Sequence, residues 1–79
     1  MSKIMNSILA FALKNESHVR LITLNSAKIN GIIVDFDDTH IIITDYIDGG
    51  QRSCIVARDK VVSFMLEEEA MDKFVESNT

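Results

Sequence analysis

The 79-residue sequence predicts a small, mainly β domain. An N-terminal α-helix precedes five short strands that form a strongly bent antiparallel barrel, and a short C-terminal helix follows. Three observations predict this order. Apolar residues recur at helical spacing over residues 4–14, strand-like patterns cover residues 19–66, and helical spacing returns over residues 67–76. Because short turns join the strand segments, neighbouring segments must run antiparallel.

The first element is an amphipathic helix over residues 4–14. Its apolar side chains recur three and four positions apart and so form one stripe. The polar segment 14–17 ends the helix. The stripe consists of Ile4, Met5, Ile8, Leu9, Phe11, Ala12 and Leu13.

The first two strands are predicted on either side of a turn at Asn25-Ser26. The first begins at Val19 and alternates in polarity, and the second covers residues 28–37. Gly31 interrupts the second strand. A glycine inside a strand marks a bulge, a sharp bend or a close approach of another backbone segment. We therefore expect this strand to bend at Gly31 and to serve both halves of the barrel.

Three further strands complete the predicted barrel. The third covers residues 40–45, and its run Ile41-Ile42-Ile43 predicts burial on both faces or one face offered to a neighbouring subunit. The turn Asp48-Gly49-Gly50 leads to the fourth strand, residues 51–58. The connection at residues 59–60 is very short, and the fifth strand covers residues 61–66.

Net charge divides the chain into two parts. Residues 67–79 contain five acidic residues and one lysine, which account for the whole net charge of −4, so residues 1–66 are neutral overall. We therefore predict one domain over residues 1–66, with the helix at residues 4–14 and the barrel at residues 19–66, and an acidic C-terminal helix or tail over residues 67–79. The apolar stripe of this helix is expected to pack on the barrel or on a neighbour.

Composition limits the possible functions. Cys54 is the only cysteine, so no internal disulfide is possible, and the two histidines form no metal-ligand pattern with it. No apolar run is long enough to span a membrane, and no targeting signal is found, so a reducing cytoplasm is expected. No catalytic arrangement is apparent, so an enzyme is not expected. A core this small is usually supported by oligomerisation when disulfides and metals are missing.

The segment from Val19 to Asp45, VRLITLNSAKINGIIVDFDDTHIIITD, resembles the first motif of the Sm and Sm-like (LSm) family. Residues 54–65, CIVARDKVVSFM, are similar in shape to the second motif of that family. The likeness is greatest to the bacterial RNA chaperones of the Hfq type, which also begin with a helix. The first-motif match consists of an apolar strand, Asn25, Lys28, Gly31, Phe36-Asp37 and an apolar third strand that ends in an acid.

The resemblance implies an SH3-like Sm barrel, a homo-oligomeric ring of five, six or seven subunits, and binding of single-stranded RNA around the pore without cofactor or metal. The expected role is that of an RNA chaperone or riboregulation factor. In Hfq-type rings two loops hold uridines near the pore. The corresponding segments here are Asp38-Thr39-His40 and Arg58-Asp59-Lys60. This sequence departs from the family pattern, because Thr39 replaces a stacking aromatic residue and Asp59 replaces a histidine.

The opposite face of Hfq-type rings binds adenine-rich strands through the first two strands. Here Ile22 stands where a tyrosine is usual, while Asn25, Lys28 and Asn30 are polar and suited to contacts with RNA. The preference for U-rich or A-rich RNA stays open. The missing aromatic residue, Asp59 and the acidic tail favour an alternative, a structural or protein-interaction ring of Sm fold that has lost RNA binding.

Overall fold

The chain, described by a computed structural model over residues 3–47 and 49–77, forms two helices and five strands. The predicted order of helix, five strands and helix is confirmed, and each boundary agrees within two residues. In chain order the elements are α1 (Lys3–Asn15), β1 (His18–Thr23), β2 (Lys28–Phe36), β3 (His40–Ile47), β4 (Gly50–Ala57), the 3-10 helix η1 (Arg58–Lys60), β5 (Val61–Leu66) and α2 (Glu68–Ser77).

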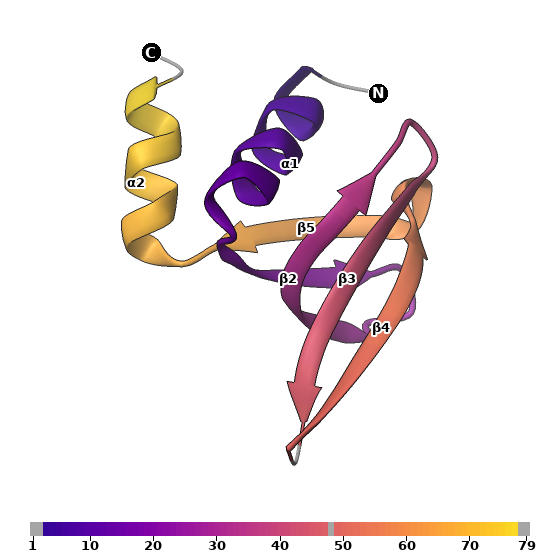
Figure 1. The fold of residues 1–79 in the computed structure, drawn as a ribbon. Coiled ribbons are helices and arrows are strands. Elements are labelled where there is room, and N and C mark those ends of the chain that lie inside the picture. The colour runs from indigo at the N-terminus through magenta and orange to yellow at the C-terminus, as the bar shows by residue number, and fades with distance from the viewer. Residues whose placement is uncertain (1–2, 48, 78–79) are drawn as a thin grey trace.

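All five strands belong to one antiparallel sheet in the order β4-β3-β2-β1-β5. The sheet is strongly bent, and Figure 1 shows β1 and β5 running nearly across the direction of β3 and β4. Within the described residues the sheet is not closed by hydrogen bonds, because β4 and β5 are its two end strands and only η1 joins them. The structure is therefore a bent, unclosed Sm-type barrel with two free strand edges.

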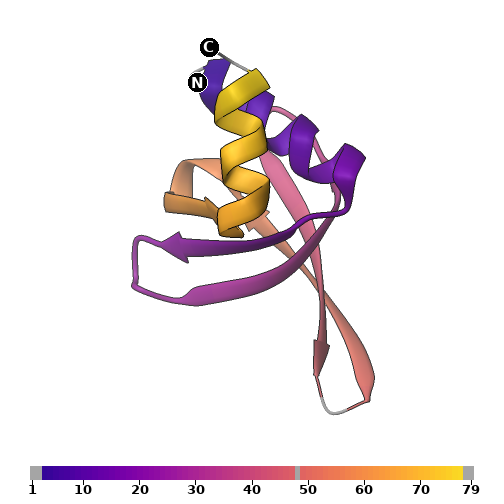
Figure 2. The ribbon, with the colours of Figure 1, turned by 90° about the vertical axis from the view of Figure 1, so that its left-hand side faces the viewer.

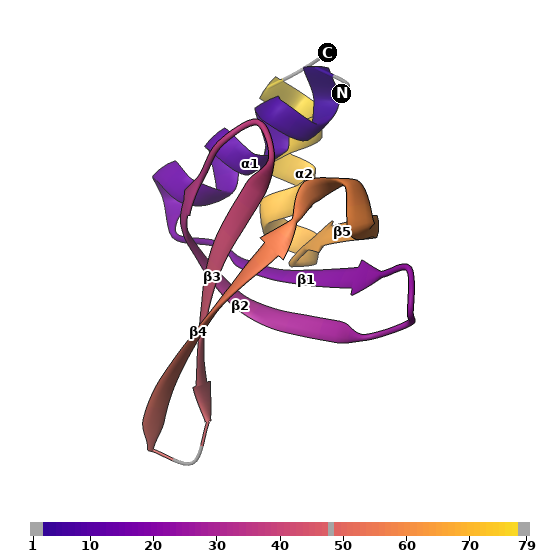
Figure 3. The same cartoon turned by 90° about the vertical axis from the view of Figure 1, so that its right-hand side faces the viewer.

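The bend at Gly31 is confirmed. Gly31 has a φ of +156°, and a Cβ at this position would overlap the carbonyl oxygen of Thr44. On one side of the bend β2 pairs with β1 as far as His18↔Ile32, and on the other it pairs with β3 from Ile32↔Thr44 onwards. Only glycine suits both the backbone angle and the close approach of β3. One strand thus serves both halves of the sheet, as Figure 3 shows.

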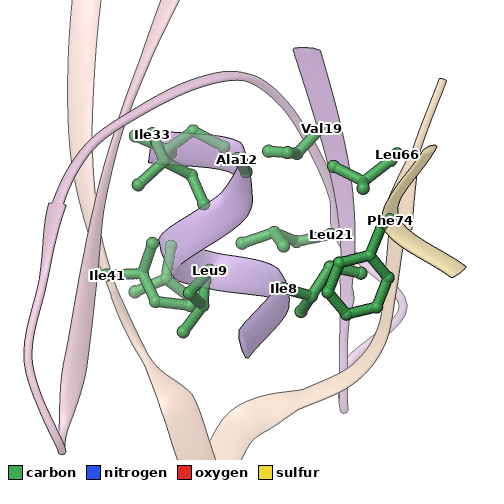
Figure 4. Packing of buried hydrophobic residues seen from close by; sticks show 11 residues of the cluster. Ile8, Leu9, Ala12, Val19, Leu21, Ile33, Ile41, Leu66 and Phe74 are labelled. Carbon is green, nitrogen blue, oxygen red and sulfur yellow. The ribbon is translucent and has the colours of Figure 1, made fainter. Parts of the chain in front are cut away.

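The core lies between α1 and the concave face of the sheet. Leu9 and Ala12 of α1 are fully buried against inward-facing strand residues such as Leu21, Ile33 and Ile41 (Figure 4). Figure 2 shows α2 beside α1, and the Phe74 and Phe11 rings pack edge to face with 5.6 Å between centroids. The acidic C-terminal helix is therefore attached to the same core as the barrel.

The apolar run in β3 is buried on one face only. Ile41 and Ile43 are fully buried, whereas Ile42 is half-buried on the other face. Burial of both faces, the first of the two alternatives predicted for this run, is not observed within the described ranges of the chain, because Ile42 on the second face is only half-buried. The second alternative, a face offered to a neighbouring subunit, stays a prediction. Beyond the core, residues 44–47 and 50–53 continue as a hairpin that projects away from the helices, here called the β3–β4 arm (Figures 2 and 3).

The turn at the tip of the arm includes Gly49, whose φ of +76° suits glycine. Asp48, the first residue of the predicted turn, lies outside the described residues. Across the two described ranges, no helix is both long and apolar enough to cross a membrane.

Candidate nucleic-acid interface

The turn between β2 and β3 is held by the carboxylate of Asp37. Its Oδ1 accepts hydrogen bonds from the backbone N–H groups of Thr39 and His40, each at 2.8 Å, and from the Thr39 hydroxyl at 3.0 Å. These bonds favour the ionised form, so the backbone N–H of Thr39, followed by that of His40, holds the pKa of Asp37 below its ordinary value. Asp37 therefore fixes the conformation of the first predicted loop.

The second predicted loop, η1, lies against this turn. The backbone N–H of Arg58 donates to the carbonyl oxygen of Thr39 at 2.9 Å. Together the two loops enclose a cavity of about 270 Å³, here called the loop cavity. Its lining residues are Asp38, Thr39, His40, Ala57 and Asp59. The structure thus brings together four of the six residues predicted for the pore loops.

The charge of the loop cavity is unfavourable for phosphate. Asp38 and Asp59 contribute two exposed carboxylates, and His40 is the only basic residue in the lining. The Nδ1 atom of His40 lies 2.9 Å from the Thr39 hydroxyl, which is already directed at Asp37. This contact orients the imidazole in the lining of the loop cavity and uses Nδ1 rather than Nε2. An RNA strand entering this cavity would bring its phosphates close to two like charges.

Arg58 does not line this cavity. Its side chain is 2% exposed, with Nη1 donating to the Asp37 carbonyl oxygen at 2.6 Å and Nη2 donating to Asn6 Oδ1 at 2.7 Å. The Nε atom is buried and has no partner in the described part of the chain. Arg58 was predicted as one of the RNA-binding residues of the pore loops, whereas here its guanidinium is enclosed by protein and links α1 to the β2–β3 turn.

Lys60 and Asn25 lie together, apart from the loop cavity. Both line an open cavity of about 530 Å³ between the β1–β2 turn and the end of β4, and the Lys60 carbonyl oxygen accepts from the Leu24 N–H at 2.9 Å. The side-chain Oδ1 of Asn25 is used within its own turn, accepting from Thr23 Oγ1 and from the Ala27 N–H. Asn25 therefore shapes the turn, and the exposed Lys60 presents its charge beside it.

The other predicted residues share the outward surface of β5, β1 and β2. Arg20 faces Asn30 across one ladder and Met65 across the other, while Ile22 faces Lys28 and Ser63. Residues directly opposite each other lie on the same side of a sheet, and the alternate residues of β1 point into the core. This surface is called the outer face, and it consists of Arg20, Ile22, Lys28, Asn30, Ser63 and Met65.

Arg20 is a member of the outer face that was missing from the predicted site residues. Its Nε donates to Asn30 Oδ1 at 2.9 Å, which holds the guanidinium against the sheet. The signal was present in the sequence, because Arg20 stands two positions before Ile22 and so shares its side of the strand. The outer face thus carries two cations, Arg20 and Lys28, and its six residues include no carboxylate. Glu67 is the first acidic side chain at its border, where it lines a cavity of about 420 Å³ with His18 and Arg20.

No metal centre accompanies these surfaces. In residues 3–47 and 49–77, no group of three or more His, Cys, Asp and Glu side chains is placed to hold a metal ion. Cys54 is a free, half-buried thiol in β4.

Comparison with known proteins identifies the fold. Neither a scan against models of protein families nor a search of curated proteins finds a match. Among solved structures, the chain is similar to the crystal structure of the pleiotropic translational regulator Hfq, with 18% sequence identity and a TM-score of 0.69. The match covers 82% of this chain and 92% of that chain. The predicted Sm-like fold of the Hfq type is therefore confirmed, at a low sequence identity.

Proposed function

We propose that this protein is a ring-forming Sm-like protein that binds single-stranded RNA on its outer face and acts in RNA-based regulation in the cytoplasm. The observation that carries the proposal is the distribution of charge. Arg20 and Lys28 lie on the outer face, whose six residues include no carboxylate and whose border carries Glu67, whereas Asp38 and Asp59 line the loop cavity. The Hfq-like fold supports the proposal, because the structure with that fold is described as a translational regulator.

The chemistry of the outer face suits an RNA strand. Arg20 uses Nε to bind Asn30, and a guanidinium has further N–H groups with which to bind phosphate oxygens. Lys28 supplies a second, mobile positive charge. Ile22, half-buried between them, offers apolar surface to the flat faces of bases. The Nδ2 group of Asn30 provides hydrogen-bond donors for a base edge or a ribose hydroxyl.

Ring assembly is the second part of the proposal. β4 and β5 are the two end strands of the sheet, and each carries an exposed apolar side chain, Ile55 at 69% and Val62 at 58%. Free edges with apolar side chains favour pairing with another chain. Pairing of β4 in one subunit with β5 in the next would satisfy both edges and cover these side chains. It would also repeat the outer face around the ring, so that weak contacts act together.

The test combines assembly and binding. Sedimentation of the purified protein is expected to show a discrete oligomer. Fluorescence anisotropy with labelled oligo-A and oligo-U is expected to show binding that weakens as salt rises, with a slope of roughly 0.7 per phosphate contact for single strands. The double variant Arg20→Glu/Lys28→Glu should bind much more weakly and with a shallower salt slope. The control Lys14→Glu/Lys73→Glu changes the net charge equally, at two exposed lysines on the helices.

Two results would count against the proposal. One is a wild-type protein that binds neither oligonucleotide at low salt. The other is equal loss of affinity in the outer-face variant and its control, since net charge rather than the outer face would then explain binding.

The acidic loop cavity favours a second candidate function, a structural or protein-interaction ring that has lost RNA binding. Asp38 and Asp59 suit a basic segment of a protein better than a phosphate. Under this alternative, affinity capture recovers proteins but no RNA, and Asp38→Asn/Asp59→Asn abolishes the capture. Under the RNA proposal, the same double variant leaves RNA binding intact or strengthens it.

A further inference from the structure

Tyr46 on the β3–β4 arm is an exposed aromatic side chain with no evident structural role. It is 64% exposed, whereas Phe74 is buried and the other three phenylalanines, Phe11, Phe36 and Phe64, are half-buried. It lies near the end of β3, within the β3–β4 arm, where it pairs with Gln51. An aromatic ring held in solvent on a two-stranded arm costs solvation and adds no packing to the core. A binding function would account for its position.

Tyr46 points to the same side of the sheet as the outer face. Alternation along β3 places Tyr46 on the side of Thr44, and Thr44 faces Ile32 across the ladder to β2. Ile32 in turn faces His18 of β1, two positions from Arg20. Tyr46 and Arg20 therefore lie on the same side of the bent sheet, with the buried Thr44 between them.

The surroundings of the Tyr46 ring suit a nucleobase. The ring lines a groove of about 520 Å³ whose other lining residues include Ile32, Val34 and Glu16. Gln51 lies directly opposite Tyr46 on β4 and lines the same groove. Its amide can both donate to and accept from the edge of a base stacked on the phenol ring.

We infer that Tyr46 is a base-stacking site for single-stranded RNA, with Gln51 contacting the base edge and with Arg20 and Lys28 holding the phosphates of neighbouring nucleotides. This inference rests on the proposed function and extends it to a site on the arm. The two cations Arg20 and Lys28, on the same side of the sheet as Tyr46, favour RNA as the occupant, while the lining of the groove itself contains one carboxylate, Glu16. Thr39 provides no stacking ring at the loop cavity. Tyr46 would provide one at a different place, on the β3–β4 arm.

The sequence offers a direct measurement. Tyr46 is the only tyrosine and there is no tryptophan, so ultraviolet emission of the intact protein comes from this one side chain. Stacking of a base on the phenol ring is expected to quench this emission as unlabelled oligo-A or oligo-U is added. Free N-acetyltyrosinamide titrated with the same RNA corrects for absorption of light by the nucleic acid.

Variants at the same position give an independent test by anisotropy. Tyr46→Phe keeps an aromatic face and should bind within about twofold of wild type. Tyr46→Leu keeps an apolar side chain without that face and should bind about 5- to 150-fold more weakly, the range expected for loss of one stacked base. Circular dichroism and sedimentation establish that both variants retain the fold and the oligomer.

Three outcomes would overturn the inference. Unchanged Tyr46 emission at RNA concentrations that saturate anisotropy, with Tyr46→Leu binding normally, refutes the site and leaves the outer-face proposal standing. Emission that changes with protein concentration alone places Tyr46 between subunits, and emission that changes only with added protein partners makes it a protein-docking residue. Absence of any RNA binding by wild type instead refutes the proposed function itself.

Discussion

Replacing Arg58 by methionine tests the buried position of its guanidinium. The side chain is 2% exposed and donates to the Asp37 carbonyl oxygen and to Asn6 Oδ1. Hydrogen bonds from a charged group contribute about 1.5–3 kcal/mol each, so loss of two would remove roughly 3–6 kcal/mol. Part of this loss is offset, because methionine fills the space without a charge and without the unpartnered Nε. We expect a net destabilisation of about 2–4 kcal/mol.

The assay is urea unfolding followed by circular dichroism, at one fixed protein concentration because assembly adds to the apparent stability. For a domain of this size, a loss of about 3 kcal/mol corresponds to a drop in Tm of roughly 12–24 °C. Lys60→Met is the matched control, since it removes a positive charge from an exposed position in the same 3-10 helix. Its effect should stay within about 0.5 kcal/mol.

The buried role of Arg58 is refuted if Arg58→Met is as stable as Lys60→Met. It is also refuted if Arg58→Met keeps full stability but loses affinity for RNA, because the guanidinium would then be a phosphate contact. Arg58→Lys separates charge from geometry. A lysine restores the positive charge but cannot reach both acceptors with a planar fork, so it should recover only part of the stability.

Two further predictions concern the turn and the bend. Because the pKa of Asp37 is lowered, the folded state binds a proton at this carboxyl less readily than the unfolded chain does. The ionised Asp37 therefore stabilises the fold above the ordinary pKa of 3.8, and this stabilisation is lost as pH falls through the lowered pKa. In NMR titrations the amide signals of Thr39 and His40 should shift in that acidic range, and the shifts should be missing in Asp37→Asn; titration at or above 3.8 would contradict this. Gly31→Ala should cost about 3 kcal/mol or more, since the new Cβ lies 2.8 Å from the Thr44 carbonyl carbon at a φ that favours glycine. The control Gly49→Ala, with φ +76° but nothing near its Cβ, should cost about 1 kcal/mol, and equal effects of the two substitutions would rule out the contact.

The order and limits of the strands were predictable because their signals are local. Periodicity, the turn residues and the glycine within β2 all act over a few positions, and Gly31 bends the strand as expected. The direction of the Arg58 side chain was not predictable in this way. Its partner Asn6 lies 52 positions away, on a helix whose placement over the barrel only the folded chain defines. Arg58 was therefore predicted to act from an exposed loop, whereas its side chain lies in the interior.

The candidate site shows the same division between local and distant information. The hairpin of β1 and β2 places Ile22, Lys28 and Asn30 on one surface, as the resemblance implied. Arg20 could have been added from alternation along β1 alone. The separation of Lys60 from the loop cavity depends instead on how η1 joins β4 to β5, which the pattern of residues 58–60 does not specify.

The bend at Gly31 has a geometric consequence beyond the single chain. β4 and β5 are opposite ends of one sheet, so the curvature of β2 determines the angle between the two edges that would dock on successive subunits. Head-to-tail association closes only when the rotation between successive copies divides a full circle, and otherwise it continues as a helical filament. In the proposed ring, the bend at Gly31 would thus contribute to the rotation between successive copies, and hence to their number and to the diameter of the central opening.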